Sequence, residues 1–286
     1  MEIIVADHAG FCFGVKNAIN MAIDAQKNGS VSTLGELIHN SEAIGELERR
    51  GIWAKEKIDD IDTCQVVIRA HGASPKVFHA LALFGYKVID ATCPFVKRVQ
   101  HEAKLRSEQG TPVVLIGDRM HPEVIATFGW SDEKAHIVDS FEDIGNLPEF
   151  ETVCVLGQTT YSVSKRDELF EAIRYRVQNV EIFDFICATT QQRQREAAEI
   201  SAKADAVIVI GDNKSANTEK LAQVAHENCG RVVKILQRNE LNGSDFLPWM
   251  TVGILAGAST PPSTIKDVVD FLKTLDREGE IKDNNA

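Results

Sequence analysis

Short apolar runs alternate along the chain with longer amphipathic stretches. Val15, Ala18 and Ala22 lie on one face of a helix, and residues 77–84 and 268–272 show the same spacing. The short runs are rich in Val and Ile and have no polar alternation, as in strands that are buried on both faces of a parallel sheet. The strands expected on this basis are Ile3–Ala6, Gln65–Arg69, Val88–Asp90, Pro112–Ile116, Val153–Leu156, Glu181–Ile186, Ala206–Ile210, Val232–Ile235 and Val252–Leu255. Strand and helix alternate over the whole length, which predicts an α/β protein with parallel sheets.

A threefold internal repeat is superimposed on this alternation. Cys12-Phe-Gly-Val-Lys and Cys93-Pro-Phe-Val-Lys share Cys-x-x-Val-Lys, and Asp-x-x-Cys ends at both Cys93 and Cys187. The three cysteines, 81 and 94 residues apart, are therefore predicted at equivalent strand-to-helix turns.

Two polar loops follow each of the three cysteines at similar distances along the sequence. The repeat predicts three similar α/β lobes, made of residues 1–92, 93–186 and 187–275, with residues 276–286 as a tail that packs back on the first lobe or is disordered. The first loops, 27 or 28 residues after each cysteine, are His39-Asn40, His121-Pro122-Glu123 and Ser215-Ala216-Asn217; the second loops, 59 to 72 residues after each cysteine, are Ala70-His71-Gly72, Gln158-Thr159-Thr160 and Gly257-Ala258-Ser259.

Ligands bind beyond the carboxyl ends of parallel strands, where the cysteines and both sets of loops are expected. If a rough threefold axis relates the lobes, Cys12, Cys93 and Cys187 converge on that axis. Three thiolates could hold zinc or an iron–sulfur cluster. Most [4Fe–4S] clusters take four Cys ligands, so three would leave one iron open for a substrate.

The polar loops carry hydroxyl, amide and imidazole donors with one carboxylate, Glu123. Such donors near helix N-termini suit a phosphate or diphosphate. Glu123 lies two residues from His121 and is the expected proton carrier. The predicted ligand-binding residues are His39, His71, His121, Thr159, Thr160, Ser215, Asn217 and Ser259.

Composition narrows the classes of partner and compartment. The 286 residues carry 31 Lys and Arg against 42 Asp and Glu, a net charge of −11, which disfavours nucleic acid and anionic membranes as partners. No apolar run approaches the roughly 18–20 residues that a bilayer requires, and no signal peptide is expected. Six cysteines without a Cys-x-x-Cys pair argue against a disulfide scaffold and favour the cytoplasm. Cys64, Cys154 and Cys229 are expected to be small buried apolar residues.

Together these motifs closely resemble the 4-hydroxy-3-methylbut-2-enyl diphosphate reductase family. The resemblance extends in order from residue 3 to about residue 270. It is carried by Gly10-Phe-Cys-Phe-Gly-Val15, Ile38-His39-Asn40, Ala70-His71-Gly72, Asp90-Ala-Thr-Cys93-Pro94, His121-Pro-Glu123, Gln158-Thr-Thr160, Ile186-Cys187 through Arg193-Gln194, Lys214-Ser215 with Asn217, and Ala256-Gly-Ala-Ser259.

The resemblance implies a trefoil of three α/β lobes around a central [4Fe–4S] cluster held by Cys12, Cys93 and Cys187. It further implies that the open iron binds the substrate's hydroxyl, and that two protons and two electrons from ferredoxin or flavodoxin remove it as water. The products would be isopentenyl and dimethylallyl diphosphate. The implied catalytic residues are Glu123, His121 and Thr159, and the implied diphosphate contacts are His39, His71, Ser215, Asn217 and Ser259. Ala216 stands where the family commonly has Ser, so one hydroxyl contact is expected to be missing there.

Two other classes of protein fit part of this pattern. One is a non-redox hydro-lyase that uses an open iron as a Lewis acid, and the other is an iron–sulfur sensor without turnover. The diphosphate-type donors disfavour the hydro-lyase, since small carboxylate substrates call for Arg clamps. Glu123 and the polar loops disfavour the sensor.

Overall fold

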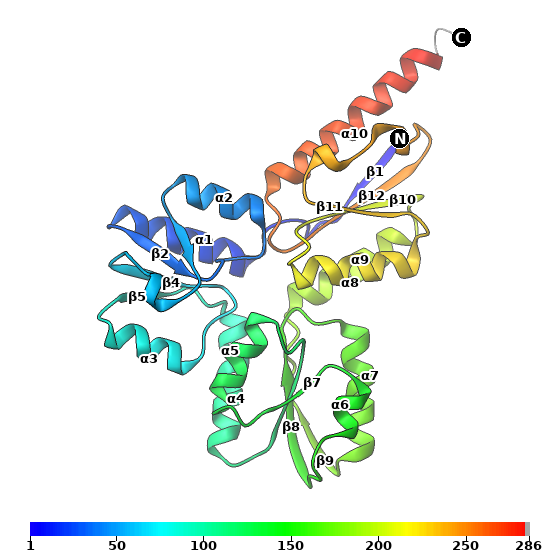
Figure 1. The fold of residues 1–286 in the computed structure, drawn as a ribbon. Helices are drawn as coiled ribbons and strands as arrows, with labels where there is room; N and C mark the ends of the chain where they lie inside the picture. Colours follow the sequence, from blue (N-terminus) through cyan, green and yellow to red (C-terminus); the bar gives the residue numbers. More distant parts are fainter. Residues whose placement is uncertain (284–286) are drawn as a thin grey trace. The chain divides into compact units, whose positions relative to one another are not determined.

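The computed structural model describes the backbone of residues 1–283 and the side chains of residues 1–275. Its strands form three four-stranded sheets, each entirely parallel (Figure 1). The predicted α/β class and the three lobes built on parallel sheets are therefore confirmed. By contacts the chain divides into two compact units, the first made of Met1–Cys12, His39–Ala43 and the residues from Ala188 onward, and the second of Phe13–Ile38 and Ile44–Cys187.

Sheet A belongs to the first unit. Val207 and Val209 of its central strand pack with α8 and α9, whereas Ile208 and Ile210 pack with α10. Alternate side chains thus bury opposite faces of the sheet, with helices on both sides (Figure 1). Its strands, in spatial order, are β1 (Glu2–Val5), β12 (Thr251–Ala256), β10 (Ala206–Ile210) and β11 (Val232–Ile235), and its helices are α8 (Ala188–Ser201), α9 (Ala216–Asn228), α10 (Pro262–Asp283) and the short η2 (Arg238–Glu240) and η3 (Gly243–Asp245).

Sheet B belongs to the second unit. Val66 and Ile68 of its strand β4 pack against Leu81 of α3, and Gln65 reaches the Ala25 carbonyl of α1 on the other face. Its strands, in spatial order, are β5 (Lys87–Asp90), β4 (Gln65–Ile68), β2 (Val31–Leu34) and β3 (Trp53–Lys55); the helices along this part of the chain are α1 (Phe13–Lys27), α2 (Ser41–Arg49), α3 (Pro75–Leu83) and the short η1 (Ile58–Asp60).

Sheet C, also in the second unit, has α4 and α5 on one face and α6 and α7 on the other (Figure 1). Its strands, in spatial order, are β9 (Asn179–Ile182), β8 (Thr152–Gly157), β6 (Val113–Ile116) and β7 (His136–Val138); its helices are α4 (Pro94–Glu108), α5 (Pro122–Trp130), α6 (Phe141–Gly145) and α7 (Val163–Arg176).

The N-terminal strand β1 corrects the predicted lobe boundaries. Residues 1–92 were expected to form one lobe, but β1 pairs with β12 from Glu2↔Thr251 to Val5↔Ile254 and so completes sheet A. Each of the three repeat cysteines therefore follows an edge strand of a sheet: Cys12 follows β1, Cys93 follows β5 and Cys187 follows β9. The predicted tail of residues 276–286 lies outside the described side chains, although the backbone of α10 continues to Asp283.

Three strands were missed and one was misplaced. Strand β2 contains Ser32 and Thr33, whose side chains are buried but hydrogen-bonded, so the run does not read as apolar. The strand expected over Glu181–Ile186 instead ends at Ile182. Phe185 and Ile186 are apolar because they pack in the core beside sheet C. The three-residue strands β3 and β7 are too short to show a period.

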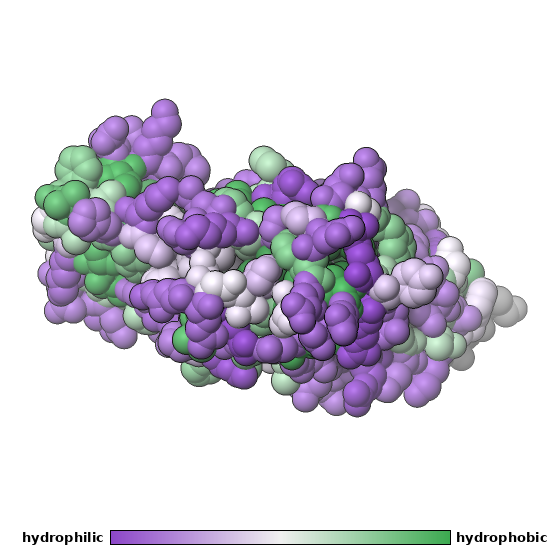
Figure 2. Space-filling model, turned by 90° about the horizontal axis from the view of Figure 1, so that it is seen from below, coloured by the Kyte–Doolittle hydropathy of each residue, from purple (hydrophilic) through white to green (hydrophobic). Residues whose placement is uncertain are grey.

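Hydrophilic side chains dominate the face of the molecule shown in Figure 2, with hydrophobic residues in smaller patches among them. Among the helices of the described residues, none combines the length and the apolar composition needed to cross a membrane.

Candidate active site

The three repeat cysteines occupy equivalent positions in the fold. Cys12, Cys93 and Cys187 directly precede α1, α4 and α8, and each is partly exposed. A helix N-terminus carries partial positive charge, which favours a negatively charged ligand beside it. The predicted strand-to-helix placement of these cysteines is confirmed.

The other three cysteines were expected to be buried apolar residues. Cys154 and Cys229 are buried, whereas Cys64 is exposed in the loop before β4, so the expectation is wrong for Cys64.

A backbone hydrogen bond repeats at each cysteine. The N–H groups of Cys12, Cys93 and Cys187 donate to the carbonyl oxygens of Ala258 (3.0 Å), Ala70 (3.0 Å) and Thr159 (3.2 Å). Each acceptor lies in the second polar loop of the same sheet, after β12, β4 or β8. The fold thus ties every cysteine to one polar loop in the same way, as the spacing of the repeat indicates.

Glu123 is a buried carboxyl group near the start of α5, with 1% of its surface exposed. It accepts hydrogen bonds from the backbone N–H of Thr159 at 2.6 Å and from the Thr159 hydroxyl at 3.0 Å. Burial raises the pKa of Glu123 to about 7, against the opposing effect of these two bonds. A carboxyl with this pKa can hold or give up a proton near neutral pH.

Two imidazoles of the second unit, those of His121 and His71, lie next to each other at the start of α5. His121 caps α5 by accepting the Glu123 N–H on Nδ1 at 3.2 Å, so its ring orientation is fixed by the helix start. The ring centroids of His71 and His121 are 5.3 Å apart in an edge-to-face arrangement. Gly72, next to His71, has a φ of +79° that a residue with a Cβ rarely adopts.

Thr160 is held through Gln158. The Gln158 amide donates to the Thr160 hydroxyl at 2.9 Å, and its oxygen accepts the Asp118 N–H at 3.2 Å. The second unit therefore brings together seven of the predicted residues beyond the ends of its strands, namely His71, Cys93, His121, Glu123, Thr159, Thr160 and Cys187.

The first unit carries the remaining predicted residues. Ser215 caps α9 by accepting the Thr218 N–H at 3.3 Å, and Ala216 is the first residue of that helix. The Ser259 hydroxyl donates to the His39 carbonyl at 2.7 Å. Asn217 is buried, and its side-chain nitrogen has no hydrogen-bond partner among the described residues. A buried amide donor of this kind costs free energy unless a ligand satisfies it.

Asp212 connects the His39–Ala43 segment to the loop before α9. Its carboxylate accepts from the Ser41 N–H at 2.9 Å, from the Ser41 hydroxyl at 2.5 Å and from the Lys214 N–H at 2.9 Å. Burial alone would raise the pKa of Asp212, but these hydrogen bonds hold it below its ordinary value. The carboxylate thus stays charged and holds the His39–Ala43 segment against the loop before α9.

Arg193 supports the loops on either side of Cys12. From α8 its buried guanidinium donates to the carbonyls of Gly10 at 2.5 Å and of Ala256 at 2.8 Å. Gly10 precedes Cys12, and Ala256 precedes the loop that accepts the Cys12 N–H. Arg193 therefore positions the backbone around this cysteine.

The sequence motifs predict no role for Asp212, Gln158 or Arg193. Asp212 lies directly after an apolar strand and Gly211, a position that could have marked it as part of a strand-end site. Gln158 and Arg193 lie inside the quoted motifs, but their roles depend on partners distant in the sequence.

Comparison with known proteins gives a consistent result over nearly the whole chain. The family model described as "LytB protein" matches residues 3–273. A 4-hydroxy-3-methylbut-2-enyl diphosphate reductase of Caldanaerobacter subterraneus subsp. tengcongensis is 39% identical, with 98% of this chain and 99% of that protein covered. The reductase of Geobacter sulfurreducens is 37% identical over 97% of this chain and 99% of its own length.

Solved structures agree with these relatives. The E-1-hydroxy-2-methyl-but-2-enyl-4-diphosphate reductase of Plasmodium falciparum superimposes with a TM-score of 0.90 at 26% identity, covering 95% of this chain and 87% of that one. A second structure, of (E)-4-hydroxy-3-methyl-but-2-enyl diphosphate reductase, the terminal enzyme of the non-mevalonate pathway, gives a TM-score of 0.72 at 36% identity, covering 96% of this chain and all of that one. Because the family match and the close relatives both extend over almost all residues, the chain belongs to the LytB family, whose members compared above are 4-hydroxy-3-methylbut-2-enyl diphosphate reductases.

Proposed function

We propose that this chain reduces 4-hydroxy-3-methylbut-2-enyl diphosphate to isopentenyl diphosphate and dimethylallyl diphosphate. The reaction consumes two electrons and two protons, breaks the bond from carbon to the hydroxyl oxygen and releases that oxygen as water. Membership of the LytB family over residues 3–273 is the observation that carries the proposal. The three equivalent cysteines and the buried carboxyl of Glu123 support it.

Cys12, Cys93 and Cys187 would hold a [4Fe–4S] cluster through their sulfur atoms. The residues fit this group because each thiol stands at the N-terminus of a helix of 14 or 15 residues, where an anionic cluster is favoured. When bound, such a cluster supplies single electrons and a Lewis-acidic iron with an open position. The chain's own contribution is to fix the sulfur positions through the repeated backbone hydrogen bonds.

His39, His71, Ser215, Asn217 and Ser259 would bind the diphosphate, with Thr160 adding a hydroxyl. The unsatisfied Asn217 amide and the N-terminus of α9 are suitable donors to phosphate oxygens. Where relatives commonly have Ser, Ala216 offers its backbone N–H alone, and Ser215 supplies the neighbouring hydroxyl. With a net charge of −11, the chain relies on these local donors to hold an anionic substrate.

Glu123 would supply protons, with His121 and Thr159 as its neighbours. The raised pKa keeps a proton on the Glu123 carboxyl up to about neutral pH. The Thr159 hydroxyl bonds this carboxyl and so provides a short path for the proton. His121 is oriented by the Glu123 N–H. For the electrons, a one-electron carrier protein such as ferredoxin or flavodoxin in the cytoplasm is the expected donor.

Anaerobic purification with iron and sulfide analysis tests the cluster, and turnover of the allylic diphosphate with a reduced dye tests the reaction. We expect about four irons and four sulfides per chain and electron-dependent release of both products. Water elimination without electron uptake would instead indicate a hydro-lyase. A cluster without any turnover would indicate a sensor.

A pair of cysteine variants tests the ligand assignment. Cys93→Ser should lose most of its iron, whereas Cys64→Ser, which alters an exposed cysteine beside sheet B, should keep iron and activity. Full iron and full activity in Cys93→Ser would contradict the assignment.

A further inference from the structure

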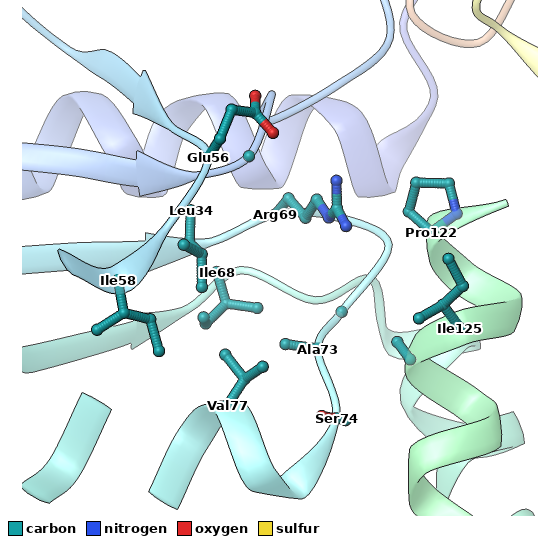
Figure 3. A pocket seen from close by; sticks show the side chains of 13 residues that line it. Leu34, Glu56, Ile58, Ile68, Arg69, Ala73, Ser74, Val77, Pro122 and Ile125 are labelled. Carbon is teal, nitrogen blue, oxygen red and sulfur yellow. The ribbon is translucent and has the colours of Figure 1, made fainter. Parts of the chain in front are cut away.

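A pocket beside sheet B lies within the second unit and contains none of the residues assigned above. Its volume is about 260 Å³. Figure 3 shows apolar side chains from sheet B and α3 gathered in one part of it, while Pro122 and Ile125 of α5 close another side. The apolar lining includes Leu34, Ile58, Ile68, Val77 and Ile125.

Arg69 brings a positive charge into this pocket. It follows β4, is only partly exposed, and extends its guanidinium toward the side near Pro122 (Figure 3). Within the described residues, no carboxylate lies within ion-pair distance of Arg69 and no hydrogen bond satisfies its guanidinium. Burial lowers the pKa of Arg69, while the charges of Glu56 and Glu36 act in the opposite direction. A desolvated, unpaired guanidinium is costly in a folded protein.

The backbone is shaped around this guanidinium. Gly35 has a φ of +71°, and a Cβ at this position would lie 2.8 Å from Nη1 of Arg69. A larger residue at position 35 would displace the charged end of Arg69. The chain therefore keeps a cation in a place where the protein supplies it with no direct partner.

We propose that this pocket binds a small monocarboxylate with a short apolar chain. The carboxylate would pair with the guanidinium of Arg69, whose planar fork matches two carboxylate oxygens. The apolar chain of the ligand would pack against Leu34, Ile68 and Val77. Glu56 also lines the pocket, so every negative charge on a ligand is repelled by this carboxylate, and a monoanion is repelled least.

The size of the pocket suits a ligand with a few carbon atoms. Pockets for drug-sized ligands have volumes of about 300–1,000 Å³, and this one is smaller. Gly72 and Pro122 in its wall are the sequence neighbours of His71 and His121, so the pocket borders the proposed active site without including its side chains.

Titration calorimetry with 4-methylpentanoate tests the proposal on the full chain, purified anaerobically with whatever cluster it holds. We expect saturable binding of one molecule per chain. The uncharged isostere 4-methylpentanamide should bind at least about tenfold more weakly, because it cannot form the charged pair. Binding is measured without turnover, so its failure is distinguishable from failure of the proposed reductase activity.

Two variants and one control locate the site. Arg69→Gln should abolish binding without lowering the thermal midpoint, and Val77→Phe should abolish it by filling the apolar part. Arg49→Gln, at an exposed arginine, should bind like the parent chain. Equal binding by Arg69→Gln and the parent, equal binding of the amide, or no saturation by about 10 mM would overturn the proposal. Displacement of the probe by equimolar inorganic phosphate would also overturn it, since the site would then select anions in general.

Discussion

The Glu123 carboxylate accepts both hydrogen-bond donors of Thr159, its backbone N–H and its hydroxyl. Glu123 lies at the start of α5, after β6, and Thr159 lies in the loop after β8; these two strands pair in parallel in sheet C. Parallel pairing brings the ends of both strands to the same edge of the sheet. A proton on the buried Glu123 carboxyl is therefore one hydrogen bond away from the Thr159 hydroxyl.

Glu123→Gln should lower turnover of the allylic diphosphate by about 10²- to 10⁴-fold, the usual effect of removing a general acid. Glutamine keeps the size of the side chain and can still bond Thr159, so iron content should not change. Steady-state kinetics with a reduced dye measures the effect. Glu142→Gln, an exposed acid in the first turn of α6, serves as the control and should match the parent. Undiminished turnover in Glu123→Gln would remove the proton-donor role.

The same carboxyl should make folding stability depend on pH. The pKa of Glu123 is about 7 in the folded chain and about 4.5 in the unfolded chain, so between these values the folded state holds the extra proton. Stability contributed by this group is therefore greatest below about pH 4.5, falls as pH rises to about 7, and is then constant. This difference in pKa between the folded and the unfolded chain corresponds to about 3 kcal/mol.

Denaturant unfolding of the parent and of Glu123→Gln at pH 5 and pH 8 measures this contribution. The variant should gain stability relative to the parent by up to about 3 kcal/mol between the two pH values. A constant difference between the two proteins would show that Glu123 does not titrate in this range.

The fold was largely predictable because buried parallel strands are short apolar runs. Strands β10 and β11 have the predicted bounds, and six of the other predicted strands agree to within one residue at each end. Strand β2 was missed because two of its buried residues are the polar Ser32 and Thr33, which form hydrogen bonds to Thr63 and Gly35. The pairing of β1 with β12 could not be inferred, because a linear repeat does not say which end of the chain completes a sheet.

The candidate site was predictable where the same residue types recur at similar spacings in the three parts of the chain. The three cysteines and the loops that bind them repeat in sequence as they do in structure. Arg193 and Asp212 are different, because their function is to hold backbone groups distant in sequence, and no local pattern encodes such partners. The Arg69 pocket could likewise not be predicted from the sequence, since its lining residues come from separate segments in sheet B, α3 and α5.

Asn217→Ala should raise the KM for the diphosphate substrate by about tenfold and leave the thermal midpoint unchanged or slightly higher. The buried Asn217 amide has no protein partner in the described part of the chain, so its removal costs the folded protein little but removes a donor to the substrate. Asn213→Ala, at an exposed asparagine in the same loop, is the matched control. Unchanged KM with a large loss of stability would indicate a structural role instead.

Asp212→Asn should destabilise the loops that carry His39 and Ser215. An amide places an N–H₂ group against one of the N–H or O–H donors that the carboxylate now accepts, leaving at least one buried donor unsatisfied. The expected loss is about 1–3 kcal/mol, with a higher KM for the diphosphate. Because Asp212 acts through Ser41, the effects of Asp212→Asn and Ser41→Ala should not add. A double-mutant cycle by denaturant unfolding should give a coupling of about 0.5–3 kcal/mol, and strict additivity would show that Asp212 does not act through this contact.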